Sequence, residues 1–221
     1  DEGDPDKEVP HRDKVMTQSY PFEEESQEIA KTVNRYSGIT WLQAPGKAFL
    51  TEYDWKRRWR TTYLIDVEDT LQPPKKIFDL SIHDRYNDPG YPVYTTTPTG
   101  EMVVLTEGNW IYLRGSGANP QGERPFLDKV NLGNMEKERI FQSGEESYES
   151  FVDFAGESRD RIITNYQSVT EPPNYFLVDL KSDQRKPLSG YEDPAPQMTG
   201  MIKKLVKYKR ADGVDLSGTL Y

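Results

Sequence analysis

The sequence predicts an all-β protein, in the form of a partial β-propeller of about three to four four-stranded blades. Aromatic residues, which suit a pleated sheet surface, make up 12% of the 221 residues and include 14 tyrosines. Sixteen glycines and 16 prolines divide the chain into short segments. Predicted strands recur in sets of four, about every 50 residues, which is the spacing of propeller blades. Because one blade cannot bury both of its faces, such units must stack.

The first complete unit follows an incomplete N-terminal blade. That partial blade is predicted to hold strands at Val15–Phe22 and Glu28–Asn34. The complete unit has predicted strands at Gly38–Leu42, Lys47–Tyr53, Arg60–Val67 and Lys75–Leu80. The turn Ala44-Pro45-Gly46 separates its first two strands, because Pro and Gly favour turn conformations.

Two further units are predicted after residue 90. The middle unit has predicted strands at Tyr91–Thr97, Glu101–Thr106, Pro125–Leu132 and Glu138–Gln142, and the last unit at Tyr148–Phe154, Arg161–Tyr166, Asn174–Leu180 and Arg185–Leu188. The stretch Asn109–Arg124 is interpreted as an insertion in the middle unit. A β-sandwich is the competing architecture, but it lacks a four-strand period. Since a closed ring needs about four to eight blades, the propeller is expected to be incomplete.

The C-terminal stretch Lys203–Tyr221 predicts a β-hairpin. Apolar and polar residues alternate from Leu205 to Tyr208 and again from Val214 onward, with Ala211-Asp212-Gly213 between the two runs. Asp-Gly between alternating runs is a strong hairpin signal, because glycine accepts a positive φ without steric cost. The second strand is cut off at Tyr221, so we expect further sequence after this residue.

The hairpin sequence YKRADGVDLSGTLY resembles the start of the α/β-hydrolase domain in serine peptidases of the prolyl oligopeptidase family. VPHRDKVM at Val9–Met16 and the long stretch Tyr91–Asp128 are similar to glutamyl endopeptidase-like members. The resemblance implies a partial propeller over residues 1–192, and a linker and first β-hairpin of a missing catalytic domain over residues 193–221. In this family the propeller precedes the hydrolase domain, caps its active site and restricts access to peptides or flexible chain ends.

Charge and composition narrow the classes of partner. The net charge of −9 disfavours nucleic-acid binding, which requires clustered cations. The basic cluster Lys56–Arg60 is interpreted as a solvated turn that leads into a strand. The absence of cysteine excludes disulfides, and two histidines disfavour a zinc site. No apolar run reaches the about 18 residues that a membrane helix needs, so we expect a soluble chain, with no prediction of its compartment and any signal peptide outside it.

Catalytic residues are not predicted within this chain. A serine hydrolase needs a nucleophile in a G-x-S-x-G turn, a histidine base and a carboxylate, and the sequence contains no G-x-S-x-G. His11 and His83 are interpreted as surface or structural residues, and neither a metal nor another cofactor is predicted. Arg114 and Arg124 are the candidate substrate-facing residues, because a guanidinium binds a carboxylate through two hydrogen bonds. A structural loop with solvated arginines is the alternative interpretation of this stretch.

The sequence therefore predicts a non-catalytic propeller segment of a serine peptidase, with cleavage after glutamate as the expected specificity and no activity in this chain alone. A stand-alone propeller that binds protein or glycan is the alternative, and a propeller glycosidase with paired carboxylates is a third. A G-x-S-x-G turn after Tyr221 would favour the peptidase. The expected partners are a peptide substrate, bound through the missing domain, and a second copy of the chain, since open blades expose strand edges.

Overall fold

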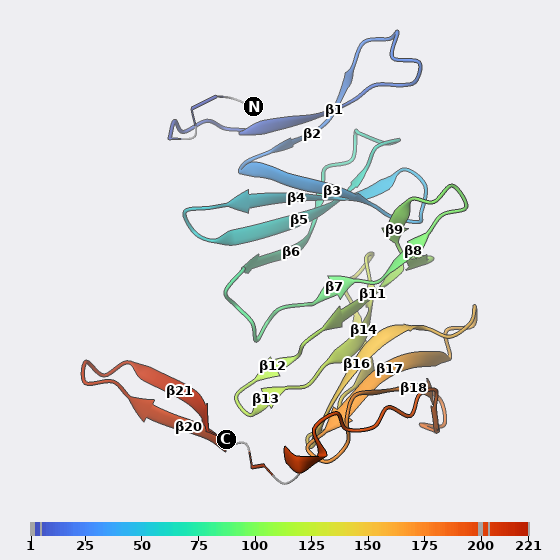
Figure 1. Cartoon of the computed structure of the whole chain (residues 1–221). Helices are drawn as coiled ribbons and strands as arrows, with labels where there is room; N and C mark the ends of the chain where they lie inside the picture. The colour runs from blue at the N-terminus through green and yellow to red at the C-terminus, as the bar shows by residue number, and fades with distance from the viewer. Residues whose placement is uncertain (1–2, 5, 199–200, 203, 221) are drawn as a thin grey trace. The chain divides into compact units, whose positions relative to one another are not determined.

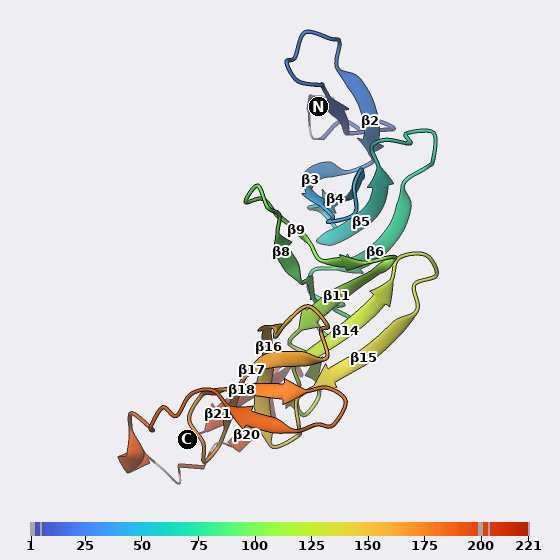
Figure 2. The same ribbon diagram turned by 90° about the vertical axis from the view of Figure 1, so that its right-hand side faces the viewer.

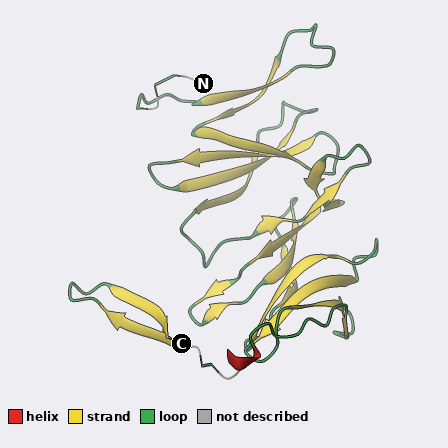
Figure 3. Cartoon of the chain, in the orientation of Figure 1, coloured by secondary structure: helices red, strands yellow, loops and turns green. Residues whose placement is uncertain are grey.

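The structure is a computed structural model that describes residues 3–4, 6–198, 201–202 and 204–220. These residues form β-strands joined by turns, with one short 3-10 helix, η1 (Pro196–Met198) (Figures 1 and 3). The chain divides into two compact units, Asp1–Gln142 and Ser143–Tyr221. No helix within the described ranges is long and apolar enough to cross a membrane.

The first unit begins with a two-stranded hairpin and a four-stranded antiparallel sheet in chain order. The strands are β1 (Asp13–Thr17), β2 (Gln27–Thr32), β3 (Arg35–Trp41), β4 (Lys47–Asp54), β5 (Trp59–Asp66) and β6 (Lys75–Ser81). The predicted strands of the first complete unit are confirmed. The predicted strand Val15–Phe22 is wrong after Thr17, because the Gln18 side chain donates hydrogen bonds to the carbonyl groups of Phe22 and Glu24 and closes a local loop.

The second sheet of this unit differs from the predicted middle blade. Its strands are β7 (Tyr91–Pro92), β10 (Thr106–Glu107), β11 (Trp110–Gly115), β14 (Phe126–Asn131) and β15 (Lys137–Gln142). The order is β10-β11-β14-β15, and β7 also pairs with β11. Two small hairpins flank it, β8 (Tyr94–Thr96) with β9 (Met102–Val104) and β12 (Ala118–Asn119) with β13 (Gly122–Glu123).

The interpretation of Asn109–Arg124 as an insertion is therefore wrong for its first half, which is the interior strand β11. Ile111, Tyr112 and Leu113 are all buried, at 0%, 3% and 1% exposure. A strand covered on both faces shows no alternation of apolar and polar residues, so its sequence lacks the usual strand signal.

Sheet β3–β6 has buried residues on both of its faces. Alternate residues of β4 point to opposite sides, so Ala48 and Leu50 pack with Ala30 of the hairpin β1–β2, whereas Phe49 packs with Ile111 of the second sheet. Figure 2 shows the strands β3–β6 between the hairpin strand β2 and strand β11 of the second sheet. The second cluster also contains Leu42, Ile77, Val104, Leu113, Val130 and Leu132. Stacking of sheets on both sides is the packing expected of neighbouring blades.

The second unit contains another four-stranded antiparallel sheet in chain order. Its strands are β16 (Ser147–Phe154), β17 (Arg161–Ser168), β18 (Asn174–Asp179) and β19 (Arg185–Pro187). All four predicted strands of the last unit are confirmed, and with them the all-β partial propeller. The predicted C-terminal hairpin is also confirmed, as β20 (Lys204–Lys209) and β21 (Asp215–Leu220) with Gly213 at a φ of 87°. Lys203 and Tyr221, the ends of the predicted stretch, lie outside the described residues.

Candidate functional site

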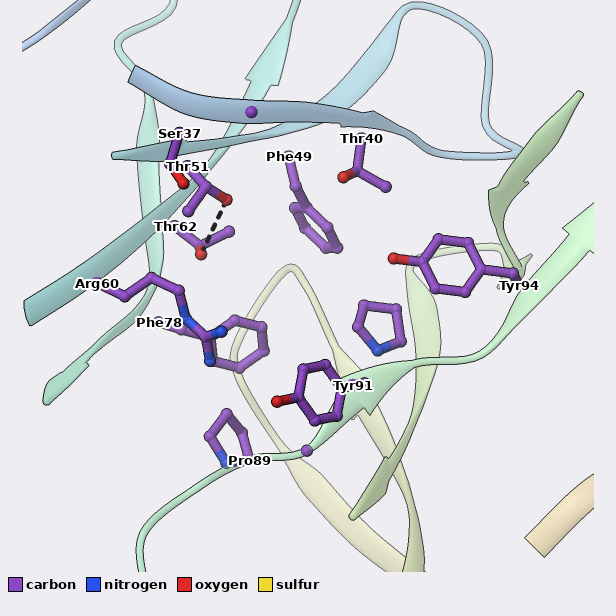
Figure 4. A pocket seen from close by; sticks show the side chains of 13 residues that line it. Ser37, Thr40, Phe49, Thr51, Arg60, Thr62, Phe78, Pro89, Tyr91 and Tyr94 are labelled. Atoms are coloured by element: carbon purple, nitrogen blue, oxygen red, sulfur yellow. Dashed lines mark hydrogen bonds between the residues drawn. The ribbon is translucent and has the colours of Figure 1, made fainter. Parts of the chain in front are cut away.

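A cleft of about 270 Å³ lies on one face of sheet β3–β6, opposite the segment 89–94 (Figure 4). The sheet contributes side chains from all four of its strands, and the segment contributes two tyrosines and two prolines. The lining is a mixture of hydroxyl groups and aromatic rings. Such a combination of apolar surface with a few polar groups is typical of ligand pockets.

The cross-strand register of the sheet brings the cleft side chains together. Thr51 of β4 is paired with Thr62 of β5, which is paired with Phe78 of β6. Thr40 of β3 is paired with Phe49 in the same way. Paired residues lie on one face of a sheet, about 4.5–5.5 Å apart between Cβ atoms. The hydroxyl groups of Thr51 and Thr62 form a hydrogen bond of 3.3 Å on this face.

The opposite wall depends on Gly90. This residue is buried and has a φ of 85°, and a Cβ atom at this position would lie 2.4 Å from the carbonyl oxygen of Arg114. Only glycine allows such a close approach of two backbones at a positive φ. The contact leads into the pairing of β7 with β11 and so fixes Tyr91 at the cleft. Figure 4 shows the hydroxyl groups of Tyr91 and Tyr94 pointing into the space beside the sheet.

Arg60 is the one charged residue of the cleft lining among the described residues. It lies on β5 and is half-buried, whereas Lys56, Arg57 and Arg58 are exposed in the preceding turn. The interpretation of the basic cluster as a solvated turn therefore holds for those three residues but not for Arg60. Within the described parts of the chain, no other residue forms a hydrogen bond or ion pair with the Arg60 side chain.

Two carboxylates near the cleft are already occupied by other donors. Asp84 lines an adjoining depression that shares Phe78 and Pro89 with the cleft. The Asn87 side chain and backbone donate hydrogen bonds of 2.8 and 3.1 Å to Asp84, which holds its pKa below the usual range. Hydrogen bonds from Lys76, Trp59 and Thr61 likewise hold the pKa of Asp79 below its usual range.

The two arginines predicted from the sequence lie elsewhere in the first unit. Arg114 is exposed on β11, paired with Leu127 and with Tyr91. Arg124 is half-buried between β13 and β14, and its N–H donates a hydrogen bond of 3.0 Å to the carbonyl of Gly117. Neither side chain lines the cleft, and their predicted role toward substrate stays a prediction.

The two histidines are both exposed, His11 before β1 and His83 in the turn after β6. In the described residues, no group of three His, Asp or Glu side chains has an arrangement that would hold a metal ion. The cleft residue missed by the sequence analysis is Arg60. The available signal was its spacing: Arg60 and Thr62 are two residues apart, so both point to the same face of β5.

Comparison with known proteins gives relatives for the whole chain. No family model matches it. It is 33% identical over 237 positions to a protein of Oryza sativa subsp. japonica named probable glutamyl endopeptidase, chloroplastic, and 33% identical over 238 positions to an Arabidopsis thaliana protein of the same name. Each alignment covers 100% of this chain and 25% of the relative, so the chain spans about a quarter of the length of these proteins.

Solved structures with a similar course of the chain include oligopeptidase B from Leishmania major and dipeptidyl peptidase 4 from Porphyromonas gingivalis. The match to oligopeptidase B has a TM-score of 0.45 at 11% identity, and it covers 96% of this chain and 36% of the oligopeptidase B chain. The match to dipeptidyl peptidase 4 has a TM-score of 0.45 at 10% identity, and it covers 87% of this chain and 32% of the dipeptidyl peptidase 4 chain. The resemblance to glutamyl endopeptidase-like proteins predicted from the sequence is confirmed by the two plant relatives.

Proposed function

We propose that this chain, which is related over its whole length to part of proteins named probable glutamyl endopeptidase, is the non-catalytic propeller segment of a serine peptidase. Its function is to restrict access to a hydrolase active site, so that peptides and flexible chain ends enter and folded proteins do not. The observation that carries the proposal is the alignment of all of this chain with a quarter of each relative. The stacked antiparallel sheets and the lack of a G-x-S-x-G turn support the same assignment.

Cleavage after glutamate is the specificity that we propose for the complete peptidase. A substrate glutamate requires a cation that can bind its carboxylate, and Arg114 and Arg124 are the candidates from the sequence. In a protein that joins this chain to a hydrolase domain, Arg114→Ala and Arg124→Ala are expected to raise KM for glutamyl peptides more than for glutaminyl peptides. An equal change for both peptides would show that these arginines have a structural role.

The proposal is tested by hydrolysis assays on the chain and on the protein that contains a hydrolase domain. Residues 1–221 alone are expected to leave a fluorogenic peptide with glutamate at the cleavage position intact. The larger protein is expected to cleave this peptide, but not the same sequence placed inside a stably folded domain. Turnover by the chain alone that survives repurification and is abolished by a serine-directed inhibitor would overturn the non-catalytic assignment. Equal cleavage of the folded and unfolded forms would overturn the access function.

A further inference from the structure

The guanidinium of Arg60 has five N–H donors in a planar arrangement, and none of them is bonded to a described residue of the chain. Half-burial removes part of the water that would otherwise solvate this charge. Among the residues that the structure describes, no aspartate or glutamate lines the cleft, although the chain has a net charge of −9. The nearby Asp79 and Asp84 accept hydrogen bonds from other residues. The cleft is therefore a cationic site in an acidic protein.

We propose that this cleft binds the carboxylate of a peptide through Arg60. A carboxylate matches the planar donor arrangement of a guanidinium and accepts two parallel hydrogen bonds from it. Phosphate shares that geometry, but the remaining lining favours a peptide. The aromatic rings of Phe49, Phe78 and Tyr91 provide apolar contacts, and the hydroxyl groups of Thr51 and Thr62 provide donors and acceptors for a peptide backbone.

The size of the cleft limits the ligand to a short segment. Its volume of about 270 Å³ lies just below the range of about 300–1,000 Å³ that is typical of pockets for drug-sized ligands. One or two residues of a peptide fill such a space. The carboxylate comes either from the C-terminus of the peptide or from an acidic side chain, and both sources have the same chemistry toward Arg60. Binding requires no peptide hydrolysis, so it is measurable on this chain whether or not the proposed peptidase function is correct.

Three matched peptides separate the sources of the carboxylate: acetyl-Gly-Phe with a free C-terminus, acetyl-Glu-Phe amide and acetyl-Gln-Phe amide. The binding of each is measured by NMR titration of the ¹⁵N-labelled chain of 221 residues. We expect the acetyl-Gln-Phe amide to bind at least tenfold more weakly than one of the two acids, because it lacks a charge for Arg60. Signals of Arg60, Thr62 and Tyr91 are expected to shift. Equal binding of all three peptides, or no binding at millimolar concentration, would overturn the proposal.

Variants assign the binding to Arg60. Arg60→Gln is expected to reduce the affinity for the acidic peptide at least tenfold, and Arg60→Lys to reduce it less, because lysine keeps the charge but loses the planar donor arrangement. Arg58→Gln is the matched control: it removes the same charge from the exposed turn two residues earlier and is expected to leave the affinity unchanged.

A second variant keeps the charge and removes the space. Thr40→Phe fills the cleft from β3 and is expected to abolish binding of the acidic peptide while Arg60 remains in place. Circular dichroism and thermal unfolding show whether each variant is folded. If Arg60→Gln does not fold, the two single variants Arg60→Lys and Thr40→Phe decide the question. Wild-type affinity in Thr40→Phe, or in a folded Arg60→Gln, would contradict the assignment.

Discussion

Glu52 in sheet β3–β6 and Glu149 in sheet β16–β19 are both buried carboxylates, with 3% and 5% exposure, but they are bound by different donors. Glu52 accepts hydrogen bonds from the backbone amides of Val33 and Asn34 at 2.8 and 3.2 Å, and from the Asn34 side chain at 3.0 Å. The hydroxyl of Tyr63 contacts it at 3.4 Å. Burial, together with the charge of Glu52, raises the pKa of Tyr63, so this phenol stays protonated as a donor.

Glu149 depends on a cation instead. Its carboxylate accepts a hydrogen bond of 2.6 Å from the Thr164 hydroxyl and forms an ion pair with Arg185. The Arg185 guanidinium also stacks on the rings of Tyr166 and Phe176, at 4.7 and 5.2 Å from their centroids. The Arg185 side chain is 36% exposed, so it retains contact with water. The fixed amide groups that bind Glu52 have no other acceptor if its carboxylate is changed. If Glu149 loses its charge, the Arg185 guanidinium that remains is still solvated by water.

The largest effect is expected for Glu52→Gln. Each carboxylate oxygen of Glu52 accepts two hydrogen bonds, so the –NH₂ group of a glutamine faces two part-buried donors whichever way its amide is turned, and these donors lose their acceptor. We expect a loss of about 3 kcal/mol in the free energy of unfolding. Urea unfolding followed by tryptophan fluorescence measures it, because all four tryptophans lie in the first unit. The control is Glu23→Gln in the exposed loop between β1 and β2 of the same unit; a loss no greater than that of the control would remove the distinction between the two glutamates.

Glu149→Gln is expected to have a smaller effect, about 1 kcal/mol, since an amide oxygen still accepts the Thr164 hydroxyl and Arg185 remains partly solvated. Far-UV circular dichroism in urea is the measurement, because the second unit contains no tryptophan. High salt is expected to lower the stability of the wild type more than that of the variant, because the variant has lost the ion pair. A loss as large as that of Glu52→Gln would show that the ion pair is as essential as the amide donors.

Asp79 extends the comparison to a carboxylate at the surface, with 36% side-chain exposure. Its pKa is lowered in the folded state by hydrogen bonds from Lys76, Trp59 and Thr61. Its contribution is therefore fully present above the unfolded pKa of about 4 and is lost as the pH falls through the lower folded value. Asp79→Asn is expected to cost less than about 1 kcal/mol at neutral pH, after allowance for solvent screening, and nothing at low pH. A pH-independent difference between the two proteins in urea unfolding would contradict this.

The smallest effect is expected at the exposed ion pair of the C-terminal hairpin. Lys209 and Asp215 are 3.1 Å apart, but their side chains are 70% and 82% exposed. Solvent and salt screen such pairs, and side-chain entropy opposes them. Lys209→Gln and Asp215→Asn are expected to leave the hairpin amide exchange rates, measured by NMR, unchanged within error. A clear rise in these rates would show that an exposed ion pair contributes to the stability of a hairpin that has few buried residues.

Much of the fold follows from local sequence signals, and the exceptions have physical causes. Strands β3–β6 and β16–β19 were predictable because turn residues separate their segments. In the middle blade, the strands predicted at Pro125–Leu132 and Glu138–Gln142 are confirmed as β14 and β15. The prediction was wrong before them, because β11 is buried on both faces and the residues near Thr95 form the short hairpin β8–β9. Local turn chemistry identifies a hairpin but not the sheet that it joins.

The cleft was less predictable than the sheets. Arg60 follows three exposed basic residues, and sequence proximity to them concealed that it begins the inward face of β5. Its surroundings depend on Gly90, whose contact with β11 joins segments far apart in the sequence. The sequence of one chain does not reveal the contact between Gly90 and β11, nor the half-burial of Arg60 that results from it.

The backbone contact at Gly90 makes the position of one cleft wall independent of the side chains that line the sheet. Because the backbone of Gly90 lies directly against the Arg114 carbonyl, the position of the segment 89–94 against β11 is set by main-chain atoms. Substitutions at Thr40, Thr51 or Phe78 therefore alter what the cleft recognises without moving its opposite wall. A cleft of this kind is suited to diversification, since new side-chain combinations on the sheet face the same fixed wall. It is also a defined starting point for engineering selectivity, with Gly90 as the position to leave untouched.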